Sequence, residues 1–407
     1  MIKAALINHY PLSLSAADAR EKVYRNFAYM LTKLGFHVEI FSISDKDSES
    51  KFLEYKQNEI KMPRPDFSSG FTMPRIMDFS MLAAFGFRPS VETMSKSNRM
   101  IEALDRYKPD VILITDTMFS KTLDRYRKRH KGNRAKIISY SDSLSIGTTL
   151  DYIDTFANTK TKAAVIRPLK KFLKGNYLAY QTQLYRLMIE VADAFITTDD
   201  FHKRQIIREF PNAKGKSFAI FPSYVLRSDI KKRKPVKKIR TLLFLGSYGY
   251  GPNADAIDYI KQRIAPKLPD KKFIISGKGC PNTTAGNIQF MDTSISASKL
   301  LDISDMCLSP LTGPNTGVKI KIFDYLSANR IVIGTKSSFI GYNAVDGVNA
   351  LIEDNIDKYA GRIKELEKRP ALLKSMQQNV HTALEGHYEK DAVNDWGRVL
   401  KFIKVLN

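Results

Sequence analysis

Short apolar segments alternate with amphipathic segments along most of the chain. Residues 3–8 form an apolar run, residues 25–34 place apolar side chains at helical spacing, and residues 37–43 alternate as a strand does. A strand, a helix closed by glycine and a second strand at this spacing predict the start of a Rossmann-like domain.

The same alternation continues through both halves of the chain. It predicts parallel α/β sheets in two Rossmann-like domains, with an irregular connection or an acceptor-facing excursion over residues 45–100. The further predicted strands are residues 111–116, 136–142, 194–198, 218–223, 241–246, 272–277, 288–291, 306–311 and 330–335.

A proline-broken basic run at residues 231–240 has nothing to bury and predicts an interdomain linker. We therefore expect an N-terminal domain at residues 1–230 and a C-terminal domain at residues 241–390. Residues 391–407 are expected to form a helix that crosses back to the first domain, with Trp396 in packing.

Charge is unevenly distributed over the 407 residues. The net charge is +23, of which residues 1–240 carry +19 and the remainder +4. A basic first half favours an anionic membrane surface, an acidic polymer or nucleic acid as a partner. Residues 160–186 mix lysines and arginines with aromatic residues, which suits an interfacial helix or the solvated face of a core helix. No recognised nucleic-acid module accompanies the charge, so no specific nucleic acid is expected.

The sequence contains no secretory signal and no apolar run long enough to span a membrane. Its two cysteines, Cys280 and Cys307, suggest neither a disulfide framework nor a metal site. These observations favour a cytoplasmic location, with peripheral attachment to the inner face of the membrane as an option.

The most informative stretch is residues 306–335, which predicts a strand, a loop, a helix beginning at Gly317 and another strand. Gly317 would allow a ligand close to the backbone, and Lys319 and Lys321 are expected in the first helical turn. Cations there oppose the helix dipole, and a bound polyanion would offset that penalty. Asp324 lies three residues beyond Lys321, where it could accept hydrogen bonds from a ribose. An ordinary surface ion pair on a packed helix is the competing interpretation.

A second glycine-rich turn follows the strand at residues 241–246. Two such turns, at Gly246 and Gly317, are expected to face one cleft and together indicate a nucleoside diphosphate site.

Four motifs carry a resemblance to a known family. They are Phe-Leu-Gly-Ser-x5-Pro-Asn-x-Asp-Ala at residues 244–256, Phe-Ile-Ile-Ser-Gly-Lys-Gly at 273–279, Gly-Val-Lys-Ile-Lys-Ile-Phe-Asp-Tyr-Leu at 317–326 and Asp-Gly-Val-Asn-Ala at 346–350. The second half of the chain, and more loosely the first, resembles glycosyltransferases of the GT-B fold, and within them retaining glycosyltransferase family 4. That fold has two Rossmann-like domains whose parallel sheets face each other across a cleft.

The resemblance implies a nucleotide-diphosphate-sugar donor. Gly246 and Ser247 would approach its pyrophosphate, Lys319 and Lys321 would neutralise it, and Asp324 takes the position of a ribose-binding glutamate. Thr316 takes the position of a glutamate that contacts the sugar. The remaining candidates for donor binding are Gly277, Asn315 and Gly317.

The resemblance further implies transfer with retention to a saccharide or lipid-linked acceptor, in the synthesis of a cell-surface polysaccharide or glycoconjugate. Cationic side chains and helix-end N–H groups can stabilise the leaving diphosphate, so no metal or other cofactor is expected. The catalytic candidates, on the acceptor side, are Arg25, Asp116 and Asp142. The alternatives are a nucleotide-sugar epimerase or phosphorylase on the same fold, and a non-catalytic polyanion-binding protein on a transferase scaffold.

Overall fold

The computed structural model describes residues 1–8, 19–44, 56–61, 99–115, 117–130, 135–141, 170–222, 236–312 and 317–406. The chain divides into two compact units. Unit 1 comprises residues 1–222 and 393–407, and unit 2 comprises residues 223–392. The predicted linker falls in unit 2, and its first half lies outside the described residues.

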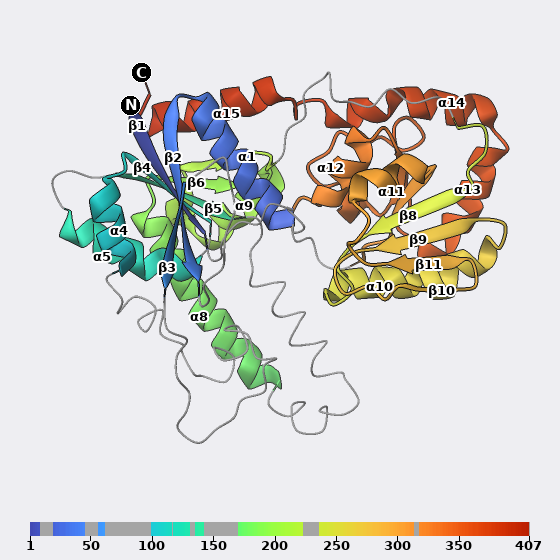
Figure 1. Ribbon diagram of the computed structural model, residues 1–407, viewed down its shortest axis with the longest axis horizontal. Coiled ribbons are helices and arrows are strands. Elements are labelled where there is room, and N and C mark those ends of the chain that lie inside the picture. Colours follow the sequence, from blue (N-terminus) through green and yellow to red (C-terminus); the bar gives the residue numbers. More distant parts are fainter. Residues whose placement is uncertain are drawn as a thin grey trace. The chain divides into compact units, whose positions relative to one another are not determined.

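Unit 1 is built on a parallel sheet with the strand order β3-β2-β1-β4-β5-β6-β7 among the described residues (Figure 1). The chain runs outward from β1 to β3 and then restarts at β4 on the other side of β1, which is the Rossmann order. The strands are β1 (Ile2–Asn8), β2 (Phe36–Ser44), β3 (Lys56–Lys61), β4 (Val111–Ile114), β5 (Lys136–Ser141), β6 (Ala194–Thr197) and β7 (Ser217–Ala219).

The central strands are mostly apolar, as is usual in a parallel sheet with helices on both faces. Every residue of β4 is fully buried, as are Leu6 and Ile7 of β1. The edge strand β3 differs, since its sequence is Lys-Gln-Asn-Glu-Ile-Lys. The expectation of an irregular connection throughout residues 45–100 is therefore wrong at β3, which pairs in parallel with β2. The remainder of that stretch up to residue 98 lies outside the described residues.

The helix at the end of the chain belongs to unit 1 from residue 393 onward, and there it lies near α1 (Figure 1). Trp396 on this helix is 1% exposed, and its ring meets that of Phe27 edge-on at a centroid distance of 5.2 Å. Trp396 is thus a packing residue. The α-helices of unit 1 are α1 (Ala19–Lys33), α4 (Arg99–Tyr107), α5 (Ser120–Arg129), α8 (Lys170–Val191), α9 (Asp200–Glu209) and α15 (Glu389–Phe402).

Unit 2 repeats the Rossmann order in the part of the chain that the structure describes, with strands in the sequence β10-β11-β9-β8-β12-β13-β14. The edge strand β10 is antiparallel to β11, and the other pairs are parallel. The strands are β8 (Thr241–Leu245), β9 (Lys272–Ser276), β10 (Thr283–Ala285), β11 (Ile288–Met291), β12 (Met306–Ser309), β13 (Ile331–Gly334) and β14 (Leu351–Ile352).

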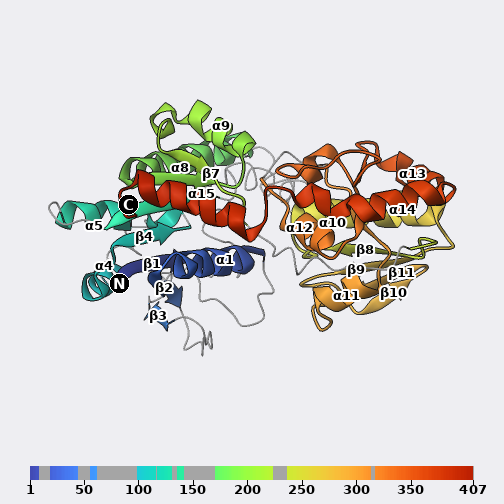
Figure 2. The same ribbon diagram turned by 90° about the horizontal axis from the view of Figure 1, so that it is seen from above.

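Helices cover both faces of this second sheet. Figure 2 shows the first helix of the unit, α10, and the crossover helix α11 on opposite sides of the strands. The α-helices of unit 2 are α10 (Gly251–Tyr259), α11 (Ala297–Ile303), α12 (Ile320–Ser327), α13 (Tyr359–Glu367) and α14 (Pro370–Asn379). Two Rossmann-like domains, as the sequence predicts, account for both units.

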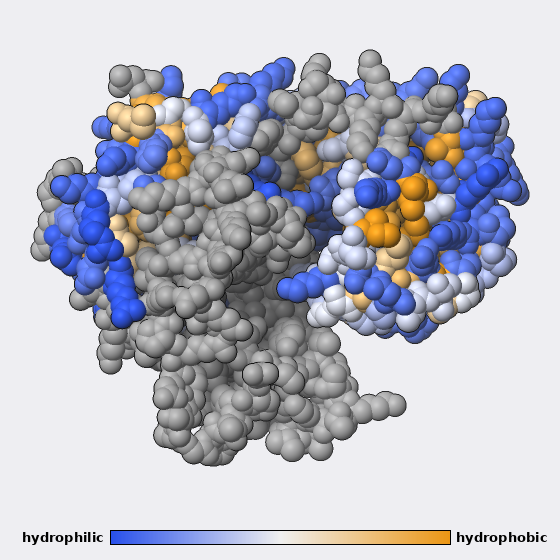
Figure 3. Space-filling view, viewed as in Figure 1, coloured by the Kyte–Doolittle hydropathy of each residue, from blue (hydrophilic) through white to orange (hydrophobic). Residues whose placement is uncertain are grey.

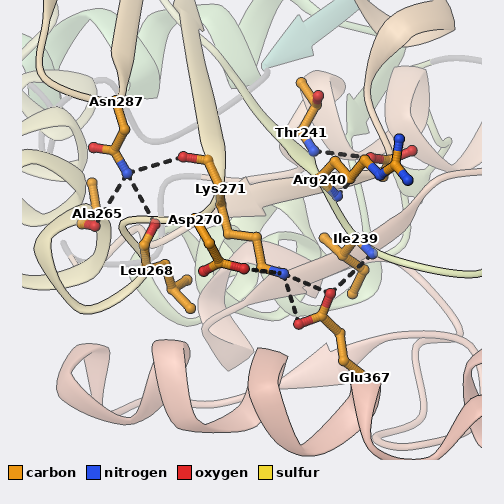
Figure 4. Close-up of polar contacts among 10 residues, drawn as sticks. Ile239, Arg240, Thr241, Ala265, Leu268, Asp270, Lys271, Asn287 and Glu367 are labelled. Atoms are coloured by element: carbon orange, nitrogen blue, oxygen red, sulfur yellow. Dashed lines mark hydrogen bonds and ion pairs between the residues drawn. The ribbon is translucent and has the colours of Figure 1, made fainter.

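A buried cation holds the amino-terminal edge of the second sheet together (Figure 4). The Lys271 ammonium lies 2.6 Å and 2.7 Å from the two carboxylate oxygens of Glu367 on α13, and 3.1 Å from Asp270. Glu367 also accepts the backbone N–H of Ile239, just before β8. These contacts fix the start of β8 and β9 against α13, at the opposite end of the strands from the glycine-rich turns.

The helices α4 and α5 of unit 1 have a hydrophilic surface. Hydrophilic residues cover the region of α4 and α5 in Figure 3, and α5 contributes Arg127, Lys128 and Arg129 in its last turn. Within the described residues, none of the helices combines the length and the apolar character that crossing a bilayer requires.

Candidate functional site

The strand order of unit 2 reverses between β8 and β12, which are paired side by side. In open α/β sheets, ligands bind at such a switch point, beyond the carboxyl ends of the strands. Two loops leave the sheet there. One runs from Gly246 to α10, and the other leads from β12 through Gly317 to α12.

Two glycines bring the backbone together at the end of β8. A Cβ on Gly277 would lie 2.1 Å from the carbonyl oxygen of Gly246, so any side chain at residue 277 would displace the loop. Gly246 in turn donates its N–H to the Ser276 carbonyl at 2.8 Å. The predicted donor residues Gly246 and Gly277 therefore touch directly.

Asn253, on the first turn of α10, joins this loop to α12. Its Nδ2 donates to the Ser247 carbonyl at 3.2 Å, and its Oδ1 accepts a hydrogen bond from Lys321 Nζ at 2.7 Å. The two glycine-rich turns that the sequence predicts to form one site are thus connected by a single side chain.

The ammonium of Lys321 has an unusual environment. It lies 4.2 Å from the ring centroid of Phe244, which is fully buried. Burial, with a smaller contribution from the charge of Lys319, lowers the pKa of Lys321 to about 7. No carboxylate in the described part of the chain pairs with this ammonium. A partly buried cation without an acidic partner favours an anionic ligand.

The start of α12 differs from the prediction. The helix begins at Ile320, so Lys319 is its N-cap residue, with extended backbone, and only Lys321 lies in the first turn. Gly317 has a φ of +80°, and its carbonyl accepts a hydrogen bond from Lys319 Nζ at 2.7 Å. The positive φ of Gly317 explains why the helix starts later than predicted, because a residue in the left-handed region cannot be part of an α-helix.

Two tyrosine hydroxyls connect α12 to neighbouring segments. The Leu245 N–H, at the end of β8, donates to Tyr325 Oη at 2.7 Å, and Tyr342 Oη donates to the Lys319 carbonyl at 2.8 Å. Burial, together with the charge of Asp324, raises the pKa of Tyr342 well above its usual value. Asp324 lies on α12, one turn beyond Lys321.

The other predicted residues are distributed as follows. Ser247 is exposed on the loop after β8, and Arg25 lies on α1 in unit 1. Asp116, Asp142, Asn315 and Thr316 lie outside the described residues. The structure thus brings together Gly246, Ser247, Gly277, Gly317, Lys319, Lys321 and Asp324 in unit 2.

Sequence reasoning missed Asn253 and Tyr325. Asn253 follows Pro252 in the motif at residues 244–256, and that pair was the available signal. No sequence signal marked Tyr325, since an aromatic residue at that helical spacing is equally typical of a residue that only packs in the core.

The arrangement offers the Lys321 ammonium, with Lys319 nearby, backbone that a ligand could approach at Gly246, and the Asp324 carboxylate one turn along α12. Among the described residues no group of three or more His, Cys, Asp or Glu side chains is placed to hold a metal ion. These side chains are suited to binding a diphosphate together with a hydroxylated group.

Comparison with known families supports this interpretation. Residues 239–369, which contain all of these groups, match the family of glycosyl transferases group 1. This part of the chain is therefore similar to a group 1 glycosyltransferase domain. A comparison of the whole sequence with curated proteins gives no match.

Solved glycosyltransferase structures resemble the whole chain. Sucrose-phosphate synthase from Thermosynechococcus elongatus has a TM-score of 0.68 at 12% identity, covering 98% of each chain. TarM gives 0.65 at 10% identity over 99% of each chain. HepE from Anabaena, in complex with UDP-glucose, gives 0.60 at 11% identity over 100% of each chain. The whole chain therefore has the GT-B fold of these proteins, as the sequence motifs predict.

Proposed function

We propose that this protein is a glycosyltransferase that transfers a sugar from a nucleotide-diphosphate-sugar donor to a saccharide or lipid-linked acceptor. The observation that carries the proposal is the Lys321 ammonium at the switch point of unit 2, hydrogen-bonded to a neutral amide and without a carboxylate partner among the described residues. A nucleoside diphosphate supplies the missing negative charge.

The donor would lie across the carboxyl ends of β8 and β12. Its pyrophosphate would approach the backbone at Gly246 and Ser247 and meet the ammonium of Lys321. Asp324, one turn along α12, would accept hydrogen bonds from the ribose hydroxyls. The complex of HepE with UDP-glucose, a protein with the same fold, supports this class of donor.

Transfer requires the sugar–phosphate bond to break, with negative charge developing on the departing diphosphate. Lys321 and the loop at Gly246 would stabilise that charge, because preorganised cations and N–H groups are most effective where charge appears. The acceptor residues Arg25, Asp116 and Asp142, retention of configuration, and a reaction without a metal or other cofactor remain predictions.

We also propose a role in cell-surface polysaccharide or glycoconjugate synthesis at the inner face of the cytoplasmic membrane. The supporting feature is α8, whose amino-terminal half extends beyond the sheet of unit 1 (Figure 1). Phe172 is 60% exposed and Leu178 is 43% exposed on that half, which also carries Lys174. Apolar side chains interspersed with lysines suit an anionic membrane surface.

Turnover of nucleotide sugars tests the proposal. Release of nucleoside diphosphate from UDP-, GDP- and ADP-sugars would be followed with and without saccharide and lipid-linked acceptors. One donor class should turn over in an acceptor-dependent manner, and Lys321→Ala should abolish this turnover while the protein stays folded. Lys299→Ala, at an exposed position on α11, is the matched control.

Other outcomes would identify the alternatives. A product that forms without any acceptor would indicate an epimerase, and sugar phosphate formed from inorganic phosphate would indicate a phosphorylase. Salt-sensitive binding of polyanions, without affinity for any nucleoside diphosphate, would indicate a non-catalytic scaffold.

A further inference from the structure

The amide of Asn253 links the loop after β8 to the ammonium of Lys321. The side chain is 7% exposed, and it bonds on one side to the Ser247 carbonyl and on the other to Lys321 Nζ. Residues 68 positions apart are held together by this one group.

Only one orientation of the amide satisfies both contacts. An amide oxygen accepts and an amide nitrogen donates, so the oxygen faces the ammonium and the nitrogen faces the carbonyl. Turning the amide over would place two donors together at Lys321 and two acceptors together at Ser247. The pair of contacts therefore fixes the direction of the side chain.

Packing against Gly246 fixes its position. A Cβ on Gly246 would lie 2.7 Å from Asn253 Cγ and 2.8 Å from each of the two amide polar atoms. The absence of a side chain at residue 246 thus serves the amide as well as the ligand.

The neutrality of the amide is the feature that points to function. An aspartate at residue 253 would have the same shape, but it would pair with the ammonium and neutralise its charge. The second carboxylate oxygen would face the Ser247 carbonyl, which is repulsive. The asparagine holds the ammonium in place and leaves its charge uncompensated.

We propose that Asn253 is a positioning residue for diphosphate recognition, which orients the Lys321 ammonium and the Ser247 peptide and leaves the positive charge available to the ligand. This inference rests on the proposed function, because it assumes a nucleoside diphosphate at that ammonium. Beyond that function, it identifies Asn253 as the residue that holds the Lys321 ammonium in position.

Asn253→Asp tests the inference, since it changes charge and leaves shape nearly intact. Dissociation constants would be measured by calorimetry for UDP, GDP and ADP and for the corresponding monophosphates. The diphosphate that binds wild-type protein should bind the variant about 10- to 100-fold more weakly. The affinity for the corresponding monophosphate should fall much less. The ratio of diphosphate to monophosphate affinity should therefore be smaller in the variant than in wild-type protein.

Asn355→Asp is the matched control. It adds the same charge at an exposed turn, where Asn355 caps η7 (Ile356–Lys358) through the Asp357 N–H and an aspartate caps equally well. Diphosphate affinity in this control should stay within about twofold of wild type.

The outcomes separate the inference from the proposed function. If wild-type protein binds none of the diphosphates, the proposed function fails. If wild-type protein binds one and Asn253→Asp binds it equally well, Asn253 has no positioning role. Equal losses of monophosphate and diphosphate affinity, with a lowered melting temperature, would show a purely structural role and would also overturn the inference.

Discussion

Lys321 is the residue on which the donor site depends. Its ammonium is held by Asn253, lies over the Phe244 ring and has a pKa lowered to about 7 by burial. In the unliganded protein this group therefore loses its proton near neutral pH, and a bound diphosphate would restore it.

The affinity for nucleoside diphosphate should depend on pH through this lysine. A bound diphosphate anion favours the ammonium and raises its pKa, so binding above pH 7 takes up a proton. The affinity should then fall by up to about tenfold for each unit of pH above neutrality, until the pKa of the complex is reached. Calorimetric titrations between about pH 7.5 and 9 would measure this slope.

Lys321→Met provides the control for that slope. This variant should bind the diphosphate weakly at every pH, with little dependence between about pH 7.5 and 9. An unchanged slope in the variant would show that another group takes up the proton. Tyr325 and Tyr342 are not candidates, because burial raises the pKa of each well above its usual value.

At the residue scale, the sequence predicted the residues expected to bind the donor better than the residues that position them, such as Asn253 and Tyr325. Glycines after strands and lysines near a helix start are visible in a motif. The contact of Asn253 with Lys321 is not, since it joins residues 68 positions apart and depends on how two helices meet the sheet.

The helix α12 carries Lys321 and is therefore the most important element of the donor site. In addition to its apolar packing, it is hydrogen-bonded to β8. Tyr325 is fully buried, and its hydroxyl oxygen accepts the N–H of Leu245 at the point where β8 ends. That hydrogen bond keeps the start of the first glycine-rich loop beside the helix that carries Lys321.

Tyr325→Phe should destabilise the protein measurably. It leaves the Leu245 N–H without its acceptor, and an unsatisfied buried donor costs about 1–3 kcal/mol. The free energy of unfolding, from urea denaturation, should fall by that amount.

Tyr359→Phe is a matched comparison with the opposite expectation. Tyr359 is also fully buried, but its hydroxyl has no hydrogen-bond partner among the residues that the structure describes. Removing it should change stability by less than about 1 kcal/mol or increase it. Equal losses in the two variants would show that the Tyr325 hydrogen bond contributes nothing specific.

At the element scale, apolar strands were predicted well and polar ones were not. The core strands, such as β8 and β12, are short and mostly apolar runs, which are typical of buried strands in a parallel sheet. The strand β3 has a polar sequence because it lies at a sheet edge, where backbone pairing with β2 defines it. The predicted start of α12 at Gly317 was wrong, because Gly317 has a left-handed backbone and the helix begins at Ile320.

At the scale of the whole molecule, two Rossmann-like units carry different surfaces. The sequence predicted both, since the strand and helix pattern restarts after the basic run at residues 231–240. Most of the +23 net charge belongs to the first half, where α8 also exposes Phe172 and Leu178.

Binding to anionic vesicles should depend on those two side chains. Burying one apolar side chain in a membrane contributes about 1.5–3 kcal/mol, so Phe172→Asp with Leu178→Asp should weaken binding at least tenfold. Sedimentation with vesicles containing phosphatidylglycerol, and with neutral vesicles, would measure it. Phe201→Asp, at a 38% exposed position on α9, is the control that should bind as wild type does. Equal binding by all variants would place the membrane contact elsewhere, and no preference for anionic vesicles would contradict it.

The central claim is that unit 2 binds a nucleoside diphosphate through Lys321 at the ends of β8 and β12. Calorimetric titration of wild-type protein and Lys321→Met with UDP, GDP, ADP, CMP and dTDP tests it most directly. We expect one diphosphate to bind wild-type protein, and to bind the variant about 10- to 100-fold more weakly while the variant stays folded. Equal affinity in the two proteins, or no binding of any nucleotide to wild-type protein, would contradict the account.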